Sequence, residues 1–183
     1  MPLKQGSLTD RVMQILMREG SIVAGMVIDE QGSSHGQTAA QALMLTKLTQ
    51  WYCPIILVEQ NPPLRLHTGN LAPPATRRTI SELRSVAGGR AKRVIKGYFN
   101  AMVQTDLDEK LAAENIAYVV IMGQQTNCCV RCTAIGASDI DRQAHPGLVQ
   151  NNIRVLSALS LMFSTYPSRD FLDHPMVEIY ADA

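Results

Sequence analysis

The sequence lacks several features that would point to particular partners. Its 183 residues carry 17 Lys and Arg against 16 Asp and Glu, and a net charge of +1 provides no field that would attract nucleic acid or an anionic membrane. No apolar run approaches the ~20 residues of a membrane helix, and residues 1–11 lack the apolar stretch of a secretory signal. Aromatic residues, at 5%, are too few for a base-stacking platform. We therefore expect a cytoplasmic protein that acts on a small-molecule substrate, with no nucleic acid and no membrane partner.

Cysteine is also scarce and unevenly placed. The four cysteines are Cys53, Cys128, Cys129 and Cys132, and three of them fall so close together that most pairings would strain the backbone. A zinc site would need four ligands, and no second C-x-x-C completes one. We therefore expect reduced thiols, no metal and no cofactor.

What the sequence does contain is enough apolar surface for a sizeable core. Hydrophobic residues make up 46% of the chain and charged residues 18%, a balance typical of a globular protein. The length predicts one domain over residues 1–183.

Apolar runs alternate with helical patterns along the chain. The runs at 21–28, 55–58, 92–96 and 117–122 read as strands buried on both faces, and helices are expected at 8–18, 37–51 and 100–114. The tail predicts strands at 153–163 and 177–181 with a short helix at 168–174, and the proline-rich stretch 60–79 predicts a surface loop. This alternation indicates an α/β fold with three α-β-α layers around a mostly parallel sheet.

Three residues stand at the carboxyl ends of predicted strands, where open parallel sheets bind their ligands. They are Asp29, Lys96 and Gly123. Taken singly, Asp29 is as well explained by a turn and Lys96 by a surface position. Their shared place at one edge of a sheet is what suggests chemistry, because a carboxylate, a cation and a nearby thiol form a nucleophile with its base.

The segment 123–137, GQQTNCCVRCTAIGA, supplies the thiol. It leaves a strand through a glycine and predicts a helix with Thr126 as its N-cap and Cys129 at the third helical position. The amino end of a helix lowers the pKa of a thiol, which makes Cys129 a candidate nucleophile. Two alternatives stay open: a core-lining cysteine, or a redox pair formed by Cys129 and Cys132.

Three segments together resemble the motifs of the isochorismatase-like cysteine hydrolases, the family of nicotinamidases and N-carbamoylsarcosine amidases. They are VIDEQG at 27–32, IKGYFNAMVQTDLDEKL at 95–111 and GQQTNCCVRCTA at 123–134. The resemblance implies an isochorismatase-like fold in which Asp29, Lys96 and Cys129 form a catalytic triad. It implies cleavage of a small amide or related C–N bond through a Cys thioester.

The resemblance carries further expectations for the site. It implies a non-proline cis peptide between Gln124 and Gln125, and an oxyanion hole made by the backbone N–H groups of Gln125 and Cys129. It also implies a homo-oligomer. The alternative is a non-catalytic, thiol-redox or metabolite-binding protein on the same scaffold.

The sequence departs from the family pattern in two places. The loop after the second strand offers only His67 and no Asp-x-His, which removes the metal site of nicotinamidases. Residues 138–152 intervene before the fifth strand and would alter a pocket wall or an interface. His35 lies six residues after Asp29 and could reach the same cleft, but a histidine on a loop is more often solvated.

Overall fold

A parallel sheet forms the centre of the molecule. The computed structural model describes residues 3–31, 34–60, 78–138, 144–163 and 165–183. Seven strands form one sheet in the order β3-β2-β1-β4-β7-β9, with β8 pairing with β4, and its pairings are parallel. Their bounds are β1 Ile22–Ile28, β2 Ile55–Gln60, β3 Lys92–Lys96, β4 Ile116–Gln124, β7 Arg154–Ala158, β8 Met162–Phe163 and β9 Val177–Tyr180.

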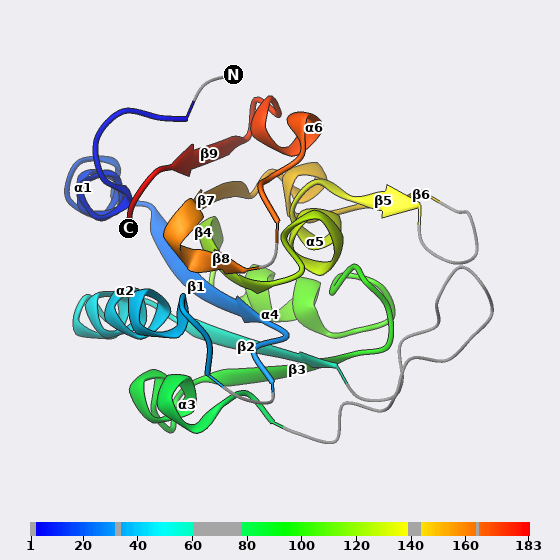
Figure 1. The fold of residues 1–183 in the computed structure, drawn as a ribbon, viewed down its shortest axis with the longest axis horizontal. Coiled ribbons are helices and arrows are strands. Elements are labelled where there is room, and N and C mark those ends of the chain that lie inside the picture. Colours follow the sequence, from blue (N-terminus) through cyan, green and yellow to red (C-terminus); the bar gives the residue numbers. More distant parts are fainter. Residues whose placement is uncertain (1–2, 32–33, 61–77, 139–143, 164) are drawn as a thin grey trace.

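Helices cover both faces of the sheet (Figure 1). One face packs against α1 Leu8–Gln14, α2 Thr38–Gln50 and α3 Ser81–Ala87, and the other against α4 Leu107–Ala113, α5 Arg131–Ile135 and α6 Arg169–Leu172. This arrangement confirms the predicted three-layer α/β fold. Within the described ranges, no helix is both long and apolar enough to cross a membrane.

The central strand β1 shows why its sequence is apolar throughout. Val23 and Val27 point into the core under α1–α3, whereas Met26 and Ile28 point into the core under α4–α6. All four side chains are fully buried. Each such burial stabilises the fold by about 1.5–3 kcal/mol, so a strand between two helical layers needs apolar residues on both faces.

The predicted helix over 100–114 is shorter than expected. Helix α4 begins only at Leu107, and residues 101–106 form turns. The Asn100 side chain accepts a hydrogen bond from the Met102 amide (2.9 Å), a local bond that competes with helix formation. Helix α3 was not expected, because its seven residues bury only Leu83 and Ala87 and leave little periodic signal.

The tail also differs from the single strand predicted over 153–163. That segment contains β7, a 3₁₀ turn at Leu159–Leu161 and then the short β8. The intervening region forms the antiparallel pair β5 Ala137–Ser138 and β6 Ala144–His145, followed by a 3₁₀ turn at Leu148–Asn151. Most of the predicted 60–79 loop lies outside the described residues.

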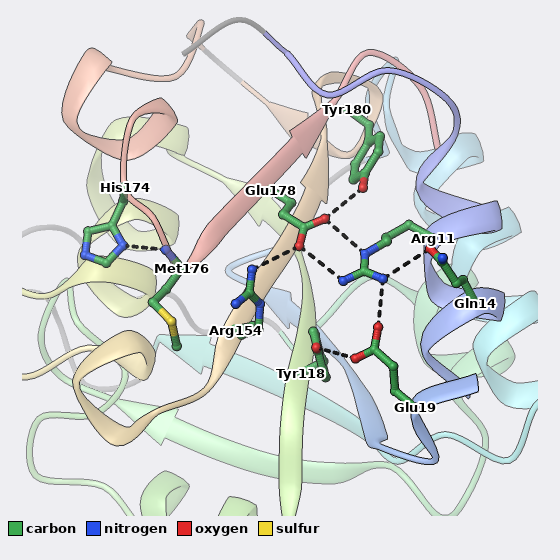
Figure 2. A network of polar contacts seen from close by, with 9 residues as sticks. All are labelled: Arg11, Gln14, Glu19, Tyr118, Arg154, His174, Met176, Glu178 and Tyr180. Atoms are coloured by element: carbon green, nitrogen blue, oxygen red, sulfur yellow. Dashed lines mark hydrogen bonds and ion pairs between the residues drawn. The ribbon is translucent and has the colours of Figure 1, made fainter. Parts of the chain in front are cut away.

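A network of charged side chains ties α1 to the sheet near the amino ends of β4 and β7 (Figure 2). The carboxylate of Glu178 on β9 accepts hydrogen bonds from Arg11 (3.1 Å), Arg154 (3.3 Å) and the Tyr180 hydroxyl (2.9 Å). Burial favours the neutral form of Glu178, but these donors outweigh it and lower its pKa. The network therefore links α1 to β7 and β9, and it includes neither Asp29 nor Lys96.

Gly123 lets the ends of β1 and β4 approach closely. Its φ of 141° is one that residues with a side chain rarely adopt, and a Cβ there would lie 2.1 Å from the carbonyl oxygen of Ile28. Only glycine fits at this point, because no relaxation of a flexible side chain could relieve a clash with backbone. The close approach brings the segments after the two strands side by side.

We predict that Gly123→Ala lowers the free energy of unfolding by about 3 kcal/mol, from backbone strain and overpacking together. Gly20→Ala is the matched control, because Gly20 also has a positive φ (62°) but a Cβ there would meet nothing within 4 Å. That control should cost only about 1–2 kcal/mol. Urea unfolding of both variants measures the difference, and equal losses would contradict the close approach at Gly123.

Candidate active site

The structure brings Asp29 and Lys96 into direct contact. Asp29 Oδ2 lies 2.7 Å from Lys96 Nζ. The lysine reaches past β2, which separates their strands in the sheet, and it also donates to the Tyr98 carbonyl (3.1 Å). The Lys96 side chain is completely buried, and that of Asp29 is 10% exposed. An ion pair this well shielded from water interacts far more strongly than one on the surface.

Asp29 is held in an unusual backbone conformation. Its φ is 55°, in the left-handed region, and its amide donates to the Val58 carbonyl (3.0 Å). The next turn is fixed by Gln31, whose side-chain oxygen accepts the Gln60 amide (2.9 Å). Strain of this kind in a residue other than glycine costs about 1–3 kcal/mol and is concentrated at functional sites.

Cys129 lies in a π-helical turn, Thr126–Val130, that follows β4 and precedes α5. The predicted N-cap at Thr126 is wrong: Gln125 occupies the cap position with φ 60°, and the Thr126 hydroxyl donates to the Phe163 carbonyl (3.1 Å). The Gln125 carbonyl accepts the Cys128 amide (2.8 Å) and the Val130 amide (3.4 Å). Single π turns of this type occur frequently at functional sites.

The thiol of Cys129 is electrostatically coupled to both residues of the ion pair. Its pKa is raised well above the ordinary value by a contact with the Cys128 side chain, by burial and by the negative charge of Asp29, with Lys96 acting in the opposite direction. The lowered pKa expected from the helix terminus is therefore wrong.

Lys96 remains charged in this setting. Burial alone would lower its pKa, but interactions with Asp29 and with the Cys129 sulfur raise it, and the net direction is upward. Asp29 Oδ1 is buried and has no hydrogen-bond partner of regular geometry among the described residues. The cluster thus combines a fixed cation with a carboxylate oxygen that is available to accept a thiol proton.

None of the four cysteines forms a disulfide. Cys132 is buried in the core, and burial raises the pKa of Cys53 to about 11. Across the part of the chain that the structure describes, no three His, Cys, Asp or Glu residues come together as metal ligands would. His67 lies outside those residues.

The fold and this cluster define a class of protein: an α/β chain with a thiol, a carboxylate and an ammonium group at the carboxyl edge of a parallel sheet. The family model of the isochorismatase domain matches residues 32–145. The chain belongs to the isochorismatase family.

Solved structures share the fold at low sequence identity. An N-carbamoylsarcosine amidase from Thermoplasma acidophilum is 17% identical, with a TM-score of 0.65 over 87% of this chain and 95% of that one. A nicotinamidase from Bacillus subtilis is 13% identical, with a TM-score of 0.68 over 86% and 98%. An isochorismatase family protein from Burkholderia thailandensis is 22% identical, with a TM-score of 0.59 over 86% and 90%. A comparison with curated proteins found no match.

Proposed function

We propose that this protein is a cysteine hydrolase that cleaves a small amide or related C–N bond through a thioester on Cys129. The observation that carries the proposal is the buried Asp29–Lys96 pair, 2.7 Å apart and coupled to the buried Cys129 thiol. Family membership and the amidase and nicotinamidase neighbours support the same class of reaction.

In the first half of the reaction, the Cys129 thiol gives its proton to Asp29 and the sulfur attacks the carbonyl carbon of the substrate. The raised pKa of Cys129 is the reason that its thiol needs a base at this position. The charge of Lys96 stabilises the thiolate, and the backbone N–H groups of Gln125 and Cys129 are the proposed donors to the oxyanion. Asp29 then protonates the leaving nitrogen, and the C–N bond breaks to leave a thioester.

In the second half, Asp29 takes a proton from water, and the hydroxide attacks the thioester carbon. The C–S bond breaks, the acid product leaves, and the proton held by Asp29 returns to the Cys129 sulfur. One water is consumed for each C–N bond cleaved, and no redox change occurs. The mechanism needs no group beyond the residues of this cluster and water.

Asp29→Asn tests the proposal because it should change two properties in opposite directions. Turnover of a panel of small carboxamides and N-carbamoyl compounds, followed by release of the amine, should fall by about 10²–10⁴-fold without the base. The pKa of Cys129 should fall, because Asp29 raises it and Lys96 lowers it, so iodoacetamide should react with Cys129 at a lower pH. The exposed Asp10→Asn on α1 is the control.

Turnover and the reactivity of Cys129 together distinguish the possible outcomes. Slow turnover with a more acidic thiol identifies Asp29 as the base. Turnover retained in Asp29→Asn would overturn the mechanism. If the wild-type protein turns over no compound of the panel and shows no acyl adduct by intact-mass spectrometry, the metabolite-binding alternative is favoured.

A further inference from the structure

A second carboxylate, that of Glu30, follows the proposed base Asp29 directly in the chain. Glu30 is completely buried, and its carboxylate is held by three side chains. They are His35 through Nε2 (2.5 Å), Gln41 through Nε2 (2.7 Å) and Gln124 through Nε2 (3.2 Å). These residues come from the loop after β1, from α2 and from the end of β4.

His35 is part of this cluster and not a solvated loop residue, so the expectation from the sequence is wrong. Its ring stacks on Phe163 with centroids 4.2 Å apart. Its Nδ1 accepts the Gln37 amide (3.3 Å), which assigns the ring proton to Nε2, facing Glu30. The Glu30 carboxylate is therefore held by the N–H groups of one histidine and two glutamine side chains.

The contacts of Glu30 lead to the nucleophile turn. Gln124 directly precedes Gln125, whose carbonyl accepts the amides of Cys128 and Val130. On the other side, Gln41 also donates to the Leu161 carbonyl (2.9 Å), just before β8. Glu30 thus joins the strand that carries Asp29 to the turn that carries Cys129.

Stability alone does not account for a carboxylate at this position. Removing a carboxylate from water costs several kcal/mol, and apolar side chains of similar volume are often neutral or stabilising in place of buried charges. Among the described residues, no Lys or Arg side chain contacts Glu30 to offset that cost. The carboxylate instead fixes the relative positions of three segments, because its two oxygens bind donors from the loop after β1, from α2 and from the end of β4.

We infer that Glu30 is a positioning residue that holds the Cys129 turn in register with Asp29 through the side chain of Gln124. The inference rests on the proposed function of Cys129 as nucleophile. Glu30 does not touch the reacting atoms: it fixes Gln124, and Gln124 fixes the backbone on which the thiol is carried. A displacement of about 1 Å in such a group can cost about 10²-fold in rate.

The test compares Glu30→Gln with Glu178→Gln. Both residues are buried carboxylates, but Glu30 follows β1, whereas Glu178 lies on β9 and belongs to the network of Figure 2. In Glu30→Gln one carboxylate oxygen becomes an amide N–H₂ that faces other donors. We expect kcat to fall about 10–100-fold with little change in KM, and Cys129, released from its buried position, to alkylate about tenfold faster relative to Cys128. Glu178→Gln should change stability but neither of these quantities.

Gln124→Met provides a second variant that removes only the link between Glu30 and the turn. It should reproduce the faster alkylation of Cys129 and decides the question if Glu30→Gln does not fold. The inference is overturned if Cys129 alkylates at the same rate in the folded Glu30 or Gln124 variant as in Glu178→Gln. Alkylation needs no substrate, so this test stands even if the hydrolase proposal fails for lack of turnover.

Discussion

Replacing Cys129 with alanine should reduce kcat by about 10⁴-fold or more, the scale on which loss of a catalytic nucleophile acts. The reason is that the Cys129 thiol is coupled to both residues of the Asp29–Lys96 pair. The side chain is small, so the fold should survive, with a loss of about 1 kcal/mol in the free energy of unfolding. Amine release and urea unfolding measure the two quantities.

Cys128→Ala is the matched control for this variant. Cys128 is the neighbour of Cys129 in the same turn and is only partly buried. Its replacement removes a thiol from this turn but leaves the proposed nucleophile in place. Because the contact with Cys128 raises the pKa of Cys129, the control should make Cys129 more acidic and should leave turnover within about tenfold of wild type. Equal loss of turnover in both variants would contradict the assignment of Cys129 as the nucleophile.

Cys132→Ala separates the hydrolase from the redox alternative. A Cys129–Cys132 pair would make both thiols essential, whereas the hydrolase needs only Cys129. Cys132 is buried and forms no disulfide in the structure. Turnover that survives Cys132→Ala but not Cys129→Ala is the result expected for a thioester mechanism.

The sequence predicts the central strands well because each is an uninterrupted apolar run between two helical layers. Strand β3 was predicted with its observed bounds, and β1 within one residue. Asp29 and Lys96 could be predicted to meet, because parallel strands bring their carboxyl ends to one edge. Family motifs then singled out Cys129 among three neighbouring cysteines.

The errors arise where distant residues decide a local property. Thr126 is a favoured N-cap type, but its hydroxyl bonds Phe163, 37 residues further on. The pKa of Cys129 is set largely by Cys128, by burial and by Asp29, and not by the helix terminus alone. The positioning role inferred for Glu30 could not be predicted from the sequence, because Gln124, which it binds, lies 94 positions away.

Replacing Lys96 with methionine should lower the free energy of unfolding by about 3–5 kcal/mol, because the Asp29 carboxylate would be left shielded from water without its cation. Methionine fills a similar volume, so packing contributes little to this loss. Lys92→Met on the same strand is the control, since Lys92 pairs with Glu114 near the surface, with both side chains 32% exposed. Such a pair contributes about 0–1 kcal/mol.

The pH dependence follows from the direction of the pKa shift of Lys96. Its pKa is raised in the folded protein, so the stability it provides is complete below the ordinary pKa of a lysine and is lost as pH rises through the raised value. The difference in stability between wild type and Lys96→Met should therefore stay constant from neutral pH to about pH 10 and shrink only above it. Urea unfolding across this range provides the measurement, and a difference that disappears near neutral pH would contradict a charged Lys96.

The double variant Asp29→Asn, Lys96→Met completes the argument by removing both charges. If the cost of Lys96→Met comes from an unpaired Asp29 carboxylate, the double variant should be more stable than Lys96→Met alone, with a coupling energy of about 1–3 kcal/mol. Simple additivity would mean that the two side chains contribute independently, which a buried contact of 2.7 Å does not allow. Both variants should lack turnover, because the base needed to remove the thiol proton and the cation that stabilises the resulting thiolate belong to the same ion pair.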